Sequence, residues 1–314
     1  MTSGPLRGRI ILDCSALLPG PFVGRLLADL GAEVFKIESP RHPDGSKAMG
    51  DAYTYLNRGK KIVTLDLTDP KDRGAFHERV RGAHGLIEAF RPQAKAKLGL
   101  DEKSLLGVNP KLCIGSLVGY PEHGPWRDRA GHNLNFEAVA GTISMFKEMP
   151  TLPLADLFAA YTAALRLTAA MDQAERTGRG SRQVVSMSRV LAEMQGLWVH
   201  EFHKTGQAPL PGTTLMSGQN PCYRLYTAGC GRRVAVAAIE HKFWVKVCGI
   251  LGLNDHVGHG LARGEQARRT IEAVQATLGE KPWSHWAPHF EGADCCVEPV
   301  ATYEEAYGPG LRPW

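Results

Sequence analysis

Strand and helix patterns alternate along the first part of this chain, and this alternation constrains the fold more than any other feature. Residues 9–13 predict a short buried strand, residues 22–30 have helical spacing closed by Gly31, and residues 32–38 predict a second strand. Two strands joined by a helix within about 30 residues form the unit from which parallel sheets are built. The pattern therefore predicts an open, Rossmann-like α/β domain with a parallel sheet, in which ligands bind beyond the carboxyl ends of the strands.

The alternation continues well past this first unit. Gly206 to Gly218 then reads as a loop rich in Gly and Pro, which predicts a domain boundary. We expect an α/β domain over residues 1–205, a smaller α+β domain over residues 206–302 and a short tail over residues 303–314. Further strands are predicted at 62–67, 85–88, 112–116, 182–186, 222–227, 232–238 and 295–300, and further helices at 71–81, 100–106, 157–171, 188–204, 242–251 and 266–278.

Composition excludes several classes of function. The net charge is +5 over 314 residues, without a block of like charge, which argues against nucleic-acid binding but suits a small anionic ligand. The seven cysteines are irregularly spaced and form no C-x-x-C, so neither a zinc site nor a disulfide framework is indicated. We expect no apolar run long enough to span a membrane, no secretory signal, and reduced thiols in a cytoplasmic protein.

His132 and Asp156 are the main catalytic candidates. Histidine titrates nearest neutrality and aspartate is a stronger acid, so together they can remove a proton and return one. Asp156 opens an apolar run that predicts a buried helix, so its carboxylate is expected at the N-cap, where the helix stabilises the charged form. Both residues also have a structural interpretation, Asp156 as a cap and His132 as a hydrogen-bonded loop residue beside Gly131.

Several segments, in order and with matching spacing, resemble one known family. They are LLPGPFVGRLLADLGAEVFKIE (17–38), LNRGKKIVTLDL (56–67), EAFRPQAKAKLGL (88–100), GHNLNF (131–136), LADLFAAY (154–161), ERTGRGSRQVV (175–185), VAVAAIEHKFW (234–244) and GADCCVEPVATYEEA (292–306). The chain resembles the class III CoA-transferase family (CaiB/BaiF type), which also contains α-methylacyl-CoA racemase. His132, Glu240 and the setting of Asp156 favour the racemase branch.

The resemblance implies an enzyme that inverts the α carbon of a 2-methylacyl-CoA, with His132 and Asp156 as the two bases and Glu240 orienting His132. From the residues alone, Glu240 can equally be a solvent-facing residue at the end of a strand. The runner-up is a CoA-transferase in which Asp156 is the nucleophile. The third alternative is a non-catalytic relative that binds CoA esters.

The resemblance also implies coenzyme A as part of the substrate, no prosthetic group and no metal. It implies a homodimer of interlocked chains whose active site lies between the first domain of one chain and the second domain of the other. Lys60 and Lys61 can alternatively be a solvated edge, whereas Arg91 stands beside a rigid proline at a strand end. The expected contacts with CoA are Lys60, Lys61, Val63, Glu88, Ala89, Arg91, Lys97, Gly131, Asn135 and Phe136.

The chain departs from the family pattern at a few positions. Asn133 stands where the racemase motif has Asp, Phe136 where it has Tyr, and Ser39 where the family usually has an Arg near the CoA nucleotide. Pro121 and Glu122 interrupt a glycine-rich loop. The sequence ends at Trp314, before the segment that in relatives returns to the first domain, and we expect this to bear on the dimer and on closure of the site.

Overall fold

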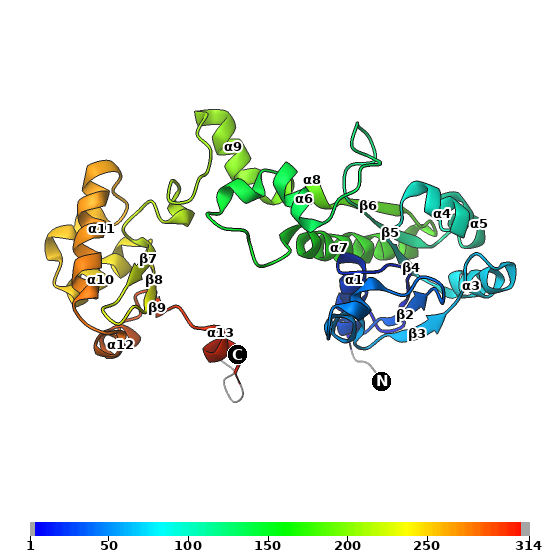
Figure 1. The fold of residues 1–314 in the computed structure, drawn as a ribbon, viewed down its shortest axis with the longest axis horizontal. Helices are drawn as coiled ribbons and strands as arrows, with labels where there is room; N and C mark the ends of the chain where they lie inside the picture. Colours follow the sequence, from blue (N-terminus) through cyan, green and yellow to red (C-terminus); the bar gives the residue numbers. More distant parts are fainter. Residues whose placement is uncertain (1–3, 309–314) are drawn as a thin grey trace. The chain divides into compact units, whose positions relative to one another are not determined.

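The computed structural model describes residues 4–308 and divides at the Lys204–Thr205 boundary into two compact units (Figure 1). The sequence places the domain boundary between residues 205 and 206. In the segment predicted as a tail, residues 303–307 form a short helix, α13 (Tyr303–Tyr307), while residues 309–314 of that prediction lie outside the described residues.

A six-stranded parallel sheet forms the centre of the first unit, as the sequence predicts. The strands lie in the order β3-β2-β1-β4-β5-β6, so the chain moves outward from β1 in one direction and then from β4 in the other. This reversal is the point at which open α/β sheets bind ligands. The strands are β1 (Ile10–Asp13), β2 (Glu33–Glu38), β3 (Lys61–Thr64), β4 (Gly85–Glu88), β5 (Cys113–Val118) and β6 (Arg182–Ser186).

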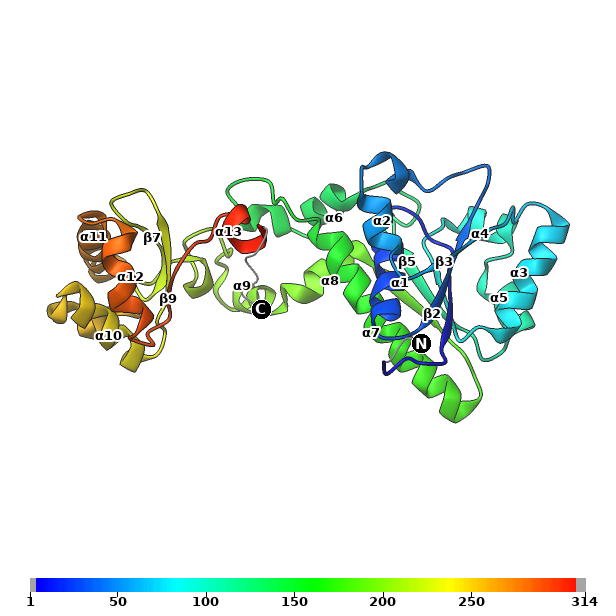
Figure 2. The same cartoon turned by 90° about the horizontal axis from the view of Figure 1, so that it is seen from below.

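Helices cover both faces of this sheet. Side chains alternate between the two faces along each strand, so neighbouring residues of β1 lie in different cores. Ile11 on β1 packs in one core with helices α1 (Pro19–Asp29) and α7 (Leu154–Thr177). Its neighbour Leu12 packs in the other, with α3 (Pro70–Gly82) and α5 (Glu102–Val108). Figure 2 shows the two helical layers on either side of the strands.

The start of α7 differs from the prediction. The helix begins at Leu154, directly after Pro153, so Asp156 lies inside the first turn and is not the N-cap. The prediction took the start of the apolar run as the start of the helix. The backbone donors of this first turn instead find side chains of α6 (Asn133–Val139): Glu137 accepts from Leu154, and Asn133 accepts from Asp156.

Two other features of the helices in this unit differ from the prediction. The single helix expected at 188–204 is two helices, α8 (Met187–Met194) and α9 (Gly196–Thr205), separated at Gln195. Helices α2 (Ala52–Asn57), α4 (Pro92–Leu98) and α6 are additional. Helix α7 is long and apolar enough to span a membrane by length and composition alone, but it packs on β5 and α1 within the core of the unit.

The second unit is a small α+β structure, as predicted. Strands β7 (Tyr223–Thr227), β8 (Arg233–Ala237) and β9 (Val297–Pro299) form an antiparallel sheet. Helices α10 (His241–Leu251), α11 (Gly264–Gly279) and α12 (Trp283–Glu291) pack against it, and the sequence did not predict α12. The fully buried ring of Trp244 on α10 lies in this core.

Candidate functional site

His132 lies at the N-terminus of α6, and its backbone is held by the residues around it. Its N–H donates to Oδ1 of Asn135 over 3.0 Å, while its side chain is exposed. The buried ring of Phe136 packs edge-on against Tyr120, with ring centroids 5.2 Å apart. A Cβ atom at Gly131 would lie 2.7 Å from the Phe136 ring, so only glycine fits there without movement. Gly131, Asn135 and Phe136, predicted as CoA contacts, therefore have structural roles beside His132.

Two hydrogen bonds join α6 to the first turn of α7, and a third, within α6, links the two accepting side chains. Asn133 Nδ2 donates to Glu137 Oε1 over 2.8 Å, and the Leu154 N–H donates to the same oxygen over 2.8 Å. The Asp156 N–H donates to Asn133 Oδ1 over 3.2 Å. The residue next to His132 thus contacts the backbone of Asp156, and the two predicted catalytic residues lie in one site.

Asp156 has an unusual acidity. Burial raises the pKa of its carboxyl group from 3.8 to about 6, the nearby charge of His132 opposes this rise, and the charge of Glu137 adds to it. Both protonation states of Asp156 are therefore accessible near neutral pH. A group of this kind can either accept or donate a proton, as acid–base catalysis requires.

A cavity of about 520 Å³ lies at the carboxyl ends of β1, β2 and β3, beside the point where the strand order reverses. Its walls are the loop after β1 (residues 14–17), the end of β2 with its following loop (36–39 and 41–45) and residues 65–68 after β3. Phe90 and Leu98 complete the apolar part of the wall. The cavity is therefore at the edge of the sheet where the strand pattern predicts a ligand.

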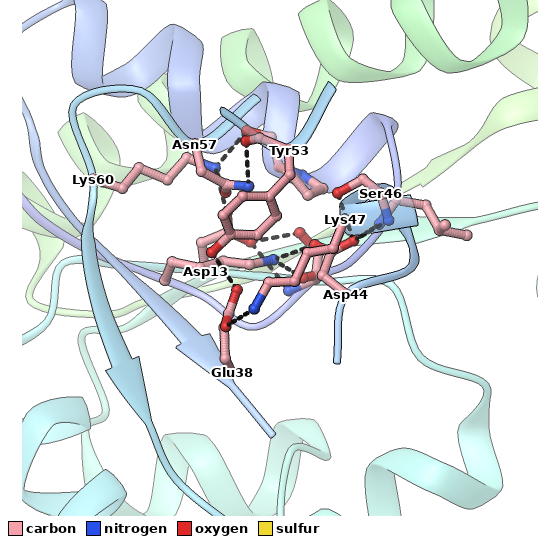
Figure 3. A network of polar contacts seen from close by, with 12 residues as sticks. Asp13, Glu38, Asp44, Ser46, Lys47, Tyr53, Asn57 and Lys60 are labelled. Atoms are coloured by element: carbon pink, nitrogen blue, oxygen red, sulfur yellow. Dashed lines mark hydrogen bonds and ion pairs between the residues drawn. The ribbon is translucent and has the colours of Figure 1, made fainter. Parts of the chain in front are cut away.

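Beneath this cavity, Asp13 at the end of β1 forms a buried ion pair with Lys60 (Figure 3). Lys60 Nζ lies 2.7 Å from Asp13 Oδ2 and also donates to the Pro21 carbonyl and to Asn57 Oδ1. Burial would raise the pKa of Asp13, but the charges of Lys60 and Lys36 outweigh it and lower the pKa to about 2. Asp13 is therefore charged at all ordinary pH values.

The same network extends into the cavity wall. Lys36 pairs with Asp44 over 3.1 Å, and Lys47 pairs with Glu38 over 2.7 Å. The Tyr53 hydroxyl also donates to Glu38 (Figure 3). These contacts tie the loop after β2 to the end of that strand, so the network gives the cavity a fixed shape.

The predicted CoA contacts on and near β3 are not at the cavity. The Lys60 side chain is fully buried and already bonded, which speaks against a contact with phosphate. Lys61 lies at the amino end of β3, where it pairs with Glu33. Val63 is half-buried within the strand.

The contacts predicted after β4 lie nearer to the cavity. Glu88 is fully buried and accepts from Lys95 Nζ over 2.8 Å, whereas Ala89 is exposed. Arg91 directly follows Phe90 of the cavity wall and is exposed. Lys97, also exposed, directly precedes Leu98 of the same wall. Arg91 and Lys97 thus remain candidates for phosphate contacts at the rim.

Glu240 belongs to the second unit. It is the exposed N-cap residue of α10, and its side chain makes no capping hydrogen bond. Its predicted role toward His132 stays a prediction.

Sequence reasoning missed several residues of the site. Arg41 and His42 line the cavity, two and three positions after Ser39, which stands where the family usually has an arginine. Lys36 on β2 and Glu137 on α6 are almost fully buried charges. The sequence could have indicated both residues, because each stands among apolar neighbours. A charged side chain buried in such a segment needs an ion-pair or hydrogen-bond partner.

Comparison with known proteins gives a consistent result. The family described as CoA-transferase family III matches residues 6–309. Human alpha-methylacyl-CoA racemase is 31% identical over 96% of this chain and 78% of its own length. Acetyl-CoA:oxalate CoA-transferase of Acetobacter aceti is 28% identical over 96% of this chain and 82% of its own length. The crystal structure of Rv3272 from Mycobacterium tuberculosis superposes with a TM-score of 0.82 and 26% identity, covering 97% of this chain and 85% of that one.

Proposed function

Because this chain belongs to CoA-transferase family III, whose members act on CoA thioesters, we propose that it is an acyl-CoA racemase or epimerase. Its substrate is a 2-methylacyl-CoA, and its reaction inverts the α carbon. The observation that carries the proposal is the position of Asp156, a half-buried carboxyl group with a pKa of about 6 that is joined to the residue beside His132.

The proposed reaction needs a base on one face of the α carbon and an acid on the other. In one direction neutral His132 removes the α proton to form an enolate, and protonated Asp156 returns a proton to the opposite face. In the other direction the two residues exchange these roles. Each positioned acid–base group contributes about 10²–10⁴-fold to the rate. The N–H groups of Leu154 and Asp156 already donate to Glu137 and Asn133, so the enolate oxygen must find other donors.

We infer that the CoA nucleotide occupies the cavity beyond β1, β2 and β3. The volume of this cavity falls within the range of ordinary ligand pockets, about 300–1,000 Å³. Phe90, Leu98 and Leu67 offer an apolar wall for the adenine ring. Arg41 is in the wall and Arg91 is at the rim, so both can meet the phosphates.

We keep a CoA-transferase as the second candidate because a named transferase matches as much of this chain as the racemase does. Above pH 6 the carboxylate of Asp156 is mostly ionised and can attack the thioester carbonyl. The CoA thiolate leaves, and a mixed anhydride forms on Asp156. The acceptor carboxylate attacks the Asp156 carbonyl of this anhydride and displaces the donor acid as its carboxylate. The CoA thiolate then attacks the acceptor carbonyl of the new anhydride, which forms the acceptor thioester and releases the Asp156 carboxylate.

A homodimer and a cytoplasmic location belong to the same proposal. Large apolar side chains are exposed on two helices of the first unit, including Leu165 on α7 and Leu197 on α9, which are 72% and 69% exposed. None of the residues of α9 is buried. We infer that a second copy of the chain covers these faces and brings its Glu240 to His132.

Incubating the protein with a 2-methylacyl-CoA in deuterated water separates the candidates. The racemase incorporates deuterium at the α carbon with loss of optical purity, and His132→Gln and Asp156→Asn each abolish inversion while retaining CoA binding. Transfer of CoA to an added carboxylic acid, without deuterium at the α carbon, would establish the transferase instead. CoA binding without either reaction would identify a non-catalytic relative.

Calorimetry with acetyl-CoA tests the assignment of the cavity. Arg41→Ala and Arg91→Ala are expected to weaken binding about tenfold each, since each removes one charged contact with phosphate. Arg176→Ala, an exposed arginine paired with Asp172 on α7, serves as the control and should bind like the wild type. Equal affinity in all four proteins would place the nucleotide elsewhere.

A further inference from the structure

Asn133 and Glu137 are two polar residues of α6 that the proposed acid–base step does not use. Glu137 is only 1% exposed, although buried carboxyl groups are rare unless they are paired. Its Oε1 atom accepts two hydrogen bonds of 2.8 Å, from Asn133 Nδ2 and from the Leu154 N–H. No cation pairs with Glu137 in the described part of the chain.

We propose that Asn133 and Glu137 are positioning residues for Asp156, which hold the first turn of α7 against α6 and place a second carboxyl group beside the reacting one. The proposal rests on the proposed function, because it assigns to both residues a role in the proton transfer of Asp156. Neither residue needs to touch the substrate for this role.

The geometry explains why residue 133 is an amide. The Asn133 side chain donates through Nδ2 to Glu137 and accepts through Oδ1 from the Asp156 N–H. Only an amide supplies a donor and an acceptor at these two ends. An aspartate would face the Glu137 carboxylate at hydrogen-bond distance without a proton between them. The asparagine that departs from the racemase motif is therefore matched to the buried glutamate one helical turn later.

The pair also acts on Asp156 through its charge. Burial is the largest cause of the raised pKa of Asp156, and the Glu137 charge raises it further. His132 acts in the opposite direction. Helices α1 and α8 and strand β5 also pack against α7. Within the described residues, no charged group on these elements or on α7 shifts the pKa of Asp156. Glu137 therefore favours the protonated form of Asp156, which is the form that donates to the enolate.

Glu137→Gln is the sharpest test, because it removes the charge and keeps the acceptor. Both hydrogen bonds reach one oxygen, Oε1, which the amide of glutamine retains. We expect the pKa of Asp156, followed by carbon-13 NMR of its carboxyl group without substrate, to fall, because the charge that raises it is gone. The acidic limb of the deuterium-exchange profile should move to lower pH by the same amount. Glu148→Gln, an exposed loop carboxyl group, is the charge-matched control and should change neither value.

A second pair of variants tests the hydrogen bonds. Asn133→Asp should lower the melting temperature by roughly 3–6 °C, since it opposes two carboxylates. Adding Glu137→Gln should restore part of the loss, because it removes the repulsion between the two carboxylates. The proposal is overturned if Glu137→Gln leaves the titration of Asp156 unchanged, or if the double variant is no more stable than Asn133→Asp. If the wild type shows no α-proton exchange while Glu137→Gln still lowers the pKa of Asp156, the proposed function is refuted and the positioning role of the pair stands.

Discussion

Asp13 is fully buried and Asp156 is half-buried, and their environments shift their pKa values in opposite directions. Two lysines beside Asp13 compensate for its burial and lower its pKa to about 2. Asp156 has a carboxyl neighbour and a single imidazole, so burial prevails and its pKa rises to about 6. The first arrangement keeps a carboxylate charged within the structure, and the second suits a group that exchanges protons near neutral pH.

Asp156 should make the protein less stable as the pH rises. Its pKa is higher in the folded than in the unfolded state, so the folded protein binds more protons between about pH 4 and pH 6. The destabilisation caused by the charged Asp156 carboxylate is absent below about pH 4 and complete above about pH 6. We expect Asp156→Asn to gain about 1–2 kcal/mol of unfolding free energy relative to wild type between pH 4 and pH 7, after allowance for solvent screening. Urea unfolding of both proteins at pH 4 and pH 7 measures this gain. The same difference in unfolding free energy between variant and wild type at the two pH values would contradict it.

Asp13 should have the opposite effect on stability. Its folded pKa is lowered, so its contribution is present above about pH 4 and is lost as the pH falls towards 2. Asp13→Asn leaves the fully buried Lys60 without its counter-ion and should cost about 3–5 kcal/mol near neutral pH. The double variant with Lys60→Met should lose markedly less. If the double variant were as unstable as the single one, the ion pair would not be the cause.

At the scale of elements, a close backbone approach joins the end of α7 to the sheet. Gly180, just before β6, lies against the residue before β5, and a Cβ atom there would be 2.0 Å from the Leu112 carbonyl oxygen. Its N–H donates to the Pro110 carbonyl over 2.8 Å. The approach sets the register of β6, whose Ser186 precedes α8.

Gly180→Ala should therefore destabilise the first unit by about 1–3 kcal/mol, because the backbone must move to admit the methyl group. Gly74→Ala is the matched control, since an added Cβ in the middle of α3 meets no atom within 4 Å. That substitution should stabilise the helix by about 0.5–1 kcal/mol. Thermal unfolding of the two variants compares them directly, and a neutral Gly180→Ala would show that the contact relaxes easily.

At the scale of the whole molecule, the exposed apolar faces of α7 and α9 are the feature that a single chain does not explain. Leu165 and Leu197 are among the most exposed apolar side chains of the first unit. Exposed patches of large apolar side chains are typical of an interface. The proposed homodimer would bury it.

Replacing both leucines by glutamate should convert the dimer to a monomer in sedimentation velocity experiments. The melting temperature of the first unit should change little, because neither side chain lies in a core of the isolated chain. Gln173→Glu, at an exposed position of the same helix α7, is the control and should leave the dimer intact. A dimer that survives the double substitution would mean that other surfaces join the chains.

Local patterns were sufficient to predict the architecture. Strand β4 was predicted at its observed bounds, and the parallel sheet followed from the spacing of strands and helices. Alternation of apolar residues and chain connectivity operate within a few residues, so the sequence carries them directly. Less visible were α4, a seven-residue helix with few apolar residues, and α12, whose Pro288 interrupts the helical pattern.

The partners of buried charges could not be predicted from the sequence alone. Lys60 was expected at the ligand and instead pairs with Asp13, 47 positions earlier in the chain. Asp156 was expected as a cap, whereas Asn133 and Glu137 satisfy the first turn of its helix. The residue types and their order thus determined the family, the parallel sheet and the chemistry available to His132 and Asp156. Only the tertiary structure decided which charges meet, because burial and the distance between groups remote in sequence set both their pairing and their acidity.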